Sequence, residues 1–190
     1  MMISEQKRWW NRRVPILRIS AFAVAAFLGV IVWVVYGHFI HSVAWDLRYH
    51  RTAIFRGQTM QVPWFWEEDE WTKYKEFELT RSHLLRPPFP TSVTISYEHL
   101  SPTDLQKEID GFRALDAKLT HHPGDYFDPD ASIDSHFVCT NRGSSRSEFE
   151  WLTCFSRDGR WRVLMIGLTQ DRSDFETILR GVDAMGTPSK

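Results

Sequence analysis

The sequence predicts an α+β protein with an N-terminal single transmembrane helix, followed by one antiparallel-sheet domain with two packed helices. Three observations lead to this fold class. Residues 19–44 contain no Lys, Arg, Asp or Glu. Short runs with alternating apolar side chains, typical of half-buried strands, recur after residue 51. Two segments that begin at Ser101 and Ser173 carry apolar residues at helical spacing, which predicts two helices on the sheet.

The uncharged run is long enough to cross a bilayer. As one helix it would reach roughly 39 Å, against a hydrocarbon core of about 30 Å. Basic residues beside a span stay cytoplasmic, and residues 1–18 hold five basic residues and one acidic residue. We therefore predict a short basic cytoplasmic segment (1–18), a transmembrane signal anchor (19–44) and an exported domain (45–190). The protein would be a single-pass inner (plasma) membrane protein with a periplasmic or extracellular C-terminal domain.

A cleaved signal peptide is the main alternative to this anchor. Its apolar core would span only about 7–15 residues, fewer than the run observed here. An uncleaved anchor is therefore favoured. Within it Ala21, Ala25 and Gly29 recur every four residues and line one helical face. A second copy could pack there, although Ala and Gly are also common in spans that do not dimerise.

The strands of the exported domain follow from its β-type runs and turn signals. Arg56-Gly57-Gln58 separates the first two runs, and Asp158-Gly159 separates the last two, which predicts a hairpin at each place. A polar loop is expected over residues 120–134. The predicted strands are residues 52–55, 59–62, 77–80, 92–98, 136–140, 149–155 and 161–168.

The two helices have recognisable starts. Ser101 is the expected N-cap of the first, and Pro102 occupies its first turn. Ser173 followed by Glu176 predicts a capping box for the second. The residues expected to face the sheet are Leu105, Ile109, Phe112 and Leu119 in the first helix, and Phe175, Ile178, Leu179 and Val182 in the second.

This order of strands, helix, strands and helix, with a hairpin that runs into Val62-Pro63 and a final Phe175-x-x-Ile178-Leu179 helix, resembles the PsbP-like α+β fold. The resemblance is architectural and covers about residues 51–182. The Pro-x-Gly-Trp usual in that family is Pro63-Trp64-Phe65-Trp66 here, without the glycine. Because such proteins are known mainly as binding or assembly modules, the resemblance implies a non-catalytic role.

Cys139 and Cys154 are the two cysteines of the chain and fall on adjacent predicted strands. In an oxidising compartment such a pair is expected to form a structural disulfide. Both sulfur atoms would share a face of the sheet if the strands pair around Arg146-Ser147. Two buried free thiols are the alternative.

The loop before the first cysteine is acidic, with Asp125, Asp128, Asp130 and Asp134. This spacing is similar to that of a calcium loop, but an EF-hand requires Gly and Glu where this chain has Ile133 and Cys139. A solvated loop is the favoured interpretation. We predict no metal site and no cofactor.

An aromatic patch, in which aromatic rings alternate with acids, follows the first hairpin. Exposed rings of this kind make good anchors for a partner, whereas buried ones would pack the core or lie beside the membrane. Packing in the core or beside the membrane is favoured over a partner surface. The candidate binding residues are Trp64, Trp66, Trp71 and Tyr74.

No catalytic motif accompanies these features: the chain lacks G-x-S-x-G, H-E-x-x-H and a Gly-rich phosphate loop. The exported part is mildly acidic, which disfavours nucleic acid as a partner. The sequence therefore predicts a membrane-anchored, non-catalytic interaction or assembly module of the cell envelope, bound to the bilayer and to an envelope protein. An envelope binding protein for a small ligand or glycan is the first alternative, and an unrecognised hydrolase is a more distant one.

Overall fold

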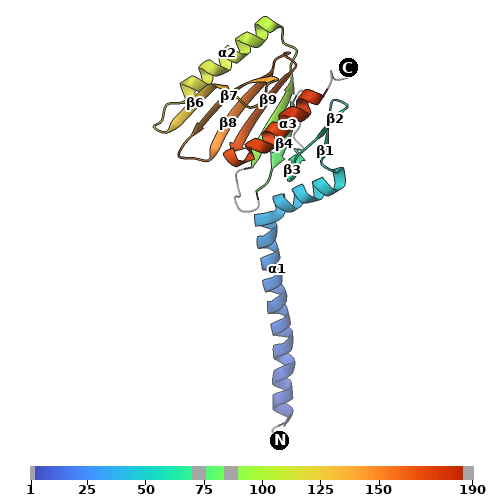
Figure 1. Ribbon diagram of the computed structural model, residues 1–190. Coiled ribbons are helices and arrows are strands. Elements are labelled where there is room, and N and C mark those ends of the chain that lie inside the picture. Colours follow the sequence, from blue (N-terminus) through green and yellow to red (C-terminus); the bar gives the residue numbers. More distant parts are fainter. Residues whose placement is uncertain (1–2, 70–75, 84–89, 186–190) are drawn as a thin grey trace. The chain divides into compact units, whose positions relative to one another are not determined.

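The computed structural model describes residues 3–69, 76–83 and 90–185 (Figure 1). The chain divides into two compact units, Met1–Ile40 and His41–Lys190. Helix α1 (Ile3–Tyr49) belongs to both. In the first unit every side chain from Ala21 to Trp33 is exposed. The second unit begins within the segment predicted as anchor, because Ser42, Trp45 and Asp46 are already buried in it.

Among the described residues, no single helix combines the length and the apolar character needed to cross a membrane. The segments Ala21–Trp33 and Tyr36–Tyr49 meet that requirement only together, as a pair separated by a bend.

The second unit has the predicted α+β class and an antiparallel sheet. Strands β1 (Thr52–Phe55) and β2 (Gln58–Gln61) form a separate hairpin. The seven strands of the main sheet lie in the spatial order β3 (Trp66–Glu68), β4 (Glu76–Arg81), β5 (Thr91–Tyr97), β9 (Trp161–Leu168), β8 (Phe149–Ser156), β7 (Phe137–Ser144) and β6 (Asp125–Ala131). Each is antiparallel to its neighbours.

Strands β3 and β6 were not expected from the sequence. Strand β6 occupies much of the predicted polar loop, so that prediction was wrong for Asp125–Ala131. It lies at the edge of the sheet, where acidic residues and Pro129 are tolerated because one side of the backbone has no ladder partner. A register shift between Asp128 and Ala131 marks a bulge in the same strand.

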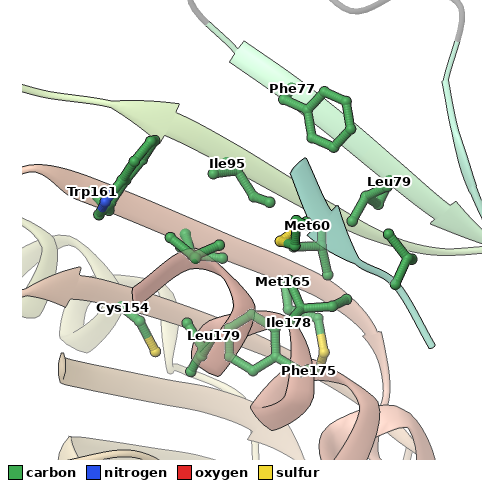
Figure 2. Packing of buried hydrophobic residues seen from close by; sticks show 14 of the residues in the cluster. Met60, Phe77, Leu79, Ile95, Cys154, Trp161, Met165, Phe175, Ile178 and Leu179 are labelled. Atoms are coloured by element: carbon green, nitrogen blue, oxygen red, sulfur yellow. The ribbon is translucent and has the colours of Figure 1, made fainter. Parts of the chain in front are cut away.

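Helix α3 (Arg172–Ala184) covers one face of the sheet and supplies its apolar core. Phe175, Ile178, Leu179 and Val182 are all fully buried, as the helical spacing predicts. Figure 2 shows three of them against Met165, Ile95 and Leu79 of the sheet and Met60 of the hairpin. The β1–β2 hairpin approaches α3 closely, since a side chain at Gly181 would meet Met60.

The start of α3 differs from the prediction. The helix begins at Arg172, after the 3-10 turn η1 (Thr169–Asp171), so Ser173 lies inside it and the predicted capping box was wrong. Asp171 is the N-cap residue, but its side chain makes no capping hydrogen bond. The carboxylate instead contacts the sheet, as described below.

Helix α2 (Pro102–Leu119) lies against the other face, over strands β6 to β8. Its predicted start is confirmed, because Ser101 accepts a hydrogen bond from the backbone N–H of Asp104 at 3.2 Å. Its predicted apolar face is only partly correct. Ile109 is buried, but Leu119 is 48% exposed, and the second buried position is taken by Asp116. The inward carboxylate is explained by the polar partners it meets on β7.

Candidate functional site

The residues of the predicted aromatic patch have different environments. Trp64 is 51% exposed, and the guanidinium of Arg51 lies 4.8 Å from the centre of its ring. Trp66 is fully buried and donates a hydrogen bond from Nε1 to Asp174 at 3.1 Å. Trp71 and Tyr74 lie outside the described residues. Of the two tryptophans of this patch that the structure describes, Trp64 is therefore the one available to a partner, and Trp66 is part of the core.

The two cysteines face each other across β7 and β8, in the predicted register around Arg146-Ser147. Their Cα atoms are 4.1 Å apart and their sulfur atoms 2.09 Å apart, the separation of a disulfide. Both are buried. The alternation of the strands places them on the α3 side of the sheet, within the apolar core.

The four aspartates of the acidic segment do not converge. Asp125, Asp128 and Asp134 accept hydrogen bonds from nearby backbone N–H groups, and Asp130 pairs with Arg113 of α2. No group of three or more His, Cys, Asp or Glu side chains that could hold a metal ion occurs in the part of the chain that the structure describes.

A row of polar residues crosses the α3 side of the sheet near the start of that helix. Ladder pairs link Arg81 with Thr91, Gly167 with Glu150, Glu150 with Gly143, and Gly143 with Tyr126. The glycines make room for neighbours, since a side chain at Gly167 would collide with Thr91, and one at Gly143 with Tyr126. The row therefore gathers charged groups from distant parts of the sequence under α3.

One end of the row holds a buried ionic cluster around Asp171. The Asp171 carboxylate is fully buried and contacts Arg81 Nη1 at 2.7 Å and His83 Nε2 at 2.9 Å. Thr91 donates its hydroxyl hydrogen to the same carboxylate. Arg81 also pairs with Asp174. These contacts connect the first turn of α3 to β4 and β5.

This cluster contains a histidine, a carboxylate and a hydroxyl, but not in the geometry of a catalytic triad. In a triad, different ring nitrogens of the histidine face the acid and the hydroxyl. Here Nε2 of His83 faces both Asp171 and, at 3.4 Å, Thr91, whereas Nδ1 faces Gln170. Thr91 is also fully buried. We therefore interpret the cluster as an attachment of α3 to the sheet.

The middle of the row holds a second buried carboxylate, Glu150. Asn141 donates a hydrogen bond to its Oε2 at 3.2 Å, and Arg172 Nη1 lies 4.0 Å from the same oxygen. Oε1 has no hydrogen-bond partner among the described residues. Burial raises the pKa of Glu150 above its ordinary value, an effect opposed by Arg172 and by the hydrogen bond from Asn141.

A hollow of about 200 Å³ lies on the opposite side of the sheet, where α2 ends. The end of α2, the paired strands β6 and β7, the turn after β7 and a ring on β8 surround it. The lining residues are Leu119, Thr120, Asp125, Arg142, Gly143, Ser144, Ser147 and Trp151.

Arg142 is the best-positioned charged group in this hollow. Its guanidinium lies 4.3 Å from the centre of the Trp151 ring, on the neighbouring strand. Its Nε lies 2.9 Å from Oδ1 of the buried Asp116 in α2. Thr140 donates a hydrogen bond to the other oxygen of Asp116 at 3.1 Å. These contacts restrain the guanidinium, although Nε donates no hydrogen bond to any described residue.

Asp125 supplies the opposite charge. Its carboxylate accepts a hydrogen bond from the backbone N–H of His122 at 2.9 Å, and Ser144 lies opposite it in the β6–β7 ladder. Chiefly because of that backbone hydrogen bond, the pKa of Asp125 lies below its ordinary value. The residues that line the hollow therefore include an ionised carboxylate, a guanidinium and several hydroxyls.

The chain matches no protein-family model, no curated protein and no solved structure.

The sequence contained no local signal for the hollow or for the buried clusters. Arg81 and Asp171 are 90 residues apart, and Asp116 and Thr140 are 24 apart. The one hint was helical spacing, because Asp116 falls on the same helical face as Ile109 and Phe112, where an apolar residue is expected.

Proposed function

We propose that the protein is a membrane-anchored, non-catalytic interaction or assembly module of the cell envelope. One observation carries the anchor: the helix from Ala21 to Trp33 buries none of its side chains. The exposed fractions are 78% for Phe22, 67% for Phe27 and 68% for Trp33. Exposed apolar surface costs about 25 cal/mol per Å² in water, so a continuous apolar helix of this kind requires lipid or a partner around it.

The basic residues before the helix support a cytoplasmic N-terminus. The second unit would then lie outside the cytoplasm, where the paired state of Cys139 and Cys154 is chemically stable. Ala21, Ala25 and Gly29 are exposed as well, which leaves one face of the anchor open to a second copy.

The partner surface that we propose centres on Trp64. Large apolar side chains are also exposed nearby in the sequence, at Leu47 (66%) and Ile54 (62%). Trp and Arg are enriched where interfaces concentrate their binding energy, and Arg51 lies over the Trp64 ring. These features favour a protein contact close to where the chain enters the second unit.

Membrane extraction tests the anchor. We expect the full chain to remain in membranes washed with alkaline carbonate and to be released by detergent. Replacing both Phe27 and Leu28 by Arg should release it, because each Arg at a span centre costs about 2.5–3.5 kcal/mol on insertion scales. Replacing both by Ala is the matched control and should leave it embedded. Release of the unaltered chain by carbonate would refute the anchor.

Photo-crosslinking tests the partner surface. A photoreactive amino acid in place of Trp64, in the full chain in its native membrane, should give one discrete crosslinked protein. The same amino acid in place of Leu115, which is 50% exposed on α2, is the control and should not give that product. Equal crosslinking at both positions, or none at Trp64, would argue against this surface.

A further inference from the structure

The hollow at the end of α2 has a chemistry that the proposed anchor and partner surface do not use. Its guanidinium can only donate hydrogen bonds, and its ionised carboxylate can only accept them. Both Arg142 and Asp125 line the same small space. A ligand that fits must therefore both accept and donate within a short distance.

The charges around the hollow disfavour an ionic ligand. Asp116 already pairs with Arg142, and Asp125 adds a second carboxylate to the same region. An anion would be attracted by the guanidinium but repelled by Asp125, and a cation would meet Arg142. Hydroxyl groups avoid both penalties, because each can accept from Arg142 and donate to Asp125.

The guanidinium is also prepared to receive a ligand. Nε is the atom that faces Asp116, which leaves the donors of the two Nη atoms for a ligand. The ring of Trp151 and the ion pair with Asp116 restrain the guanidinium, so less side-chain freedom would be lost on binding. Ser147 adds a hydroxyl that can donate or accept. The hydroxyls of Thr120, which donates to the backbone oxygen of Asp116 at 2.8 Å, and of Ser144, which bonds to Asp125, add oxygens that can accept.

The remaining wall is apolar. Leu119 is 48% exposed at the end of α2, and Trp151 also lines the hollow. Sugars present C–H groups on the faces of their rings and hydroxyls around the edge, a distribution that matches apolar walls with convergent polar groups.

We propose that this hollow binds a neutral polyhydroxyl ligand, such as a single sugar residue of a glycan. This binding site goes beyond the proposed function and does not depend on it, since all of its residues belong to the second unit.

NMR titration of the full chain tests the proposal. The ¹⁵N-labelled protein is placed in micelles of a detergent without a sugar headgroup, and methyl glucoside and N-acetylglucosamine are added separately. The indole N–H signal of Trp151 and the Nε–H signal of Arg142 should shift with at least one sugar at concentrations up to about 50 mM, a range that detects millimolar Kd values. Sodium acetate at matched ionic strength should not shift them.

Two variants on one strand connect the shifts to the hollow. Asp125→Asn removes the ionised acceptor and should weaken sugar binding about tenfold, as expected for a hydrogen bond to a charged group. Asp128→Asn, an exposed position of β6 that does not line the hollow, should bind as the unaltered chain does. Unchanged binding by Asp125→Asn, shifts with acetate but not with sugar, or no shift with either sugar would each overturn the proposal.

Discussion

The two long helices of the second unit cover opposite faces of one sheet but are held there by different forces. Helix α3 places four apolar residues, Phe175 among them, in the core with no exposed surface. Helix α2 buries one apolar residue, Ile109, and one carboxylate, Asp116. Apart from the ionic cluster at its first turn, α3 is therefore held by a conventional apolar core. Helix α2 combines a smaller apolar contact, in which Phe112 packs on Phe155, with the polar contacts of Asp116 beside an open hollow.

Because of this difference, we expect the α3 side of the sheet to provide most of the stability and the α2 side to provide the binding site. Apolar burial is non-directional and large, so the α3 side should carry most of the free energy of unfolding. A charged contact adds little net stability but fixes the orientation of its partners. On the α2 side that partner is Arg142, the residue on which the proposed ligand site depends.

Truncation of a leucine should reduce stability far more in α3 than in α2. Leu179→Ala in α3 should lower the free energy of unfolding by about 2–5 kcal/mol, because it leaves a cavity in a fully buried site. Leu115→Ala in α2, where the side chain is 50% exposed, should change it by less than about 0.5 kcal/mol. Chemical denaturation measures both, and equal losses would contradict the difference between the helices.

The cysteine pair lies on the α3 side, so its loss should also reduce stability substantially. Its sequence separation is 15 residues, and a loop of that size implies about 3 kcal/mol in the chain-entropy model. Replacing both cysteines by Ala keeps small apolar side chains in the core and removes the bond. The unfolding midpoint of this variant should match that of the reduced parent protein. A midpoint equal to that of the oxidised parent would show that the bond contributes nothing.

Charge removal at the α2 contact should have a smaller effect on stability. Asp116→Asn weakens the ion pair with Arg142 and should cost about 1–3 kcal/mol, the usual loss for a buried hydrogen-bonded charge. Asp110→Asn on the exposed side of the same helix should cost less than about 0.5 kcal/mol. The α2 contact would be unimportant if the two variants unfolded at the same denaturant concentration.

The buried carboxylate under α3 should give the smallest effect, and one of opposite sign. Because burial raises the pKa of Glu150, the folded state holds its proton at pH values where the unfolded chain has lost it. The contribution of Glu150 to the free energy of unfolding is then fully present below its ordinary pKa of 4.5, and it is lost as the pH rises through the raised pKa. Glu150→Gln should remove this decline, and at pH values above the raised pKa it should stabilise the protein by roughly 1 kcal/mol.

Denaturation at about pH 5 and about pH 8 measures the decline in both proteins. Glu108→Gln, at an exposed position of α2, controls for the loss of one acidic residue. A destabilised Glu150→Gln protein at the higher pH would mean that the contact with Arg172 outweighs the cost of burial.

The two sides of the sheet were also unequally predictable from the sequence. Helical spacing identified all four buried residues of α3, because apolar periodicity reports burial directly. Strand alternation placed both cysteines on one face for an assumed register centred on Arg146-Ser147, which the structure confirms. The α2 side depends on Asp116, Arg142 and Asp125, whose proximity arises from the tertiary fold and leaves no pattern in the chain.

The start of α3 shows the same limit. Ser173 and Glu176 have the spacing of a capping box, yet the helix begins earlier, at Arg172. The carboxylate of Asp171 is occupied by Arg81 and His83, which lie far away in the sequence. Tertiary ion pairs at this position override the local capping signal.

A pair of reporters fused after Lys190 tests whether an anchored chain carries the second unit outside the cytoplasm. In a bacterial host, a phosphatase that is active only after export should be active at this position, and a fluorescent protein that matures only in the cytoplasm should be dark. Both reporter signals should reverse if the five basic residues before the helix are replaced by Glu and five basic residues are introduced after the helix. An inactive phosphatase together with a bright fluorescent fusion in the unaltered chain would place the second unit in the cytoplasm.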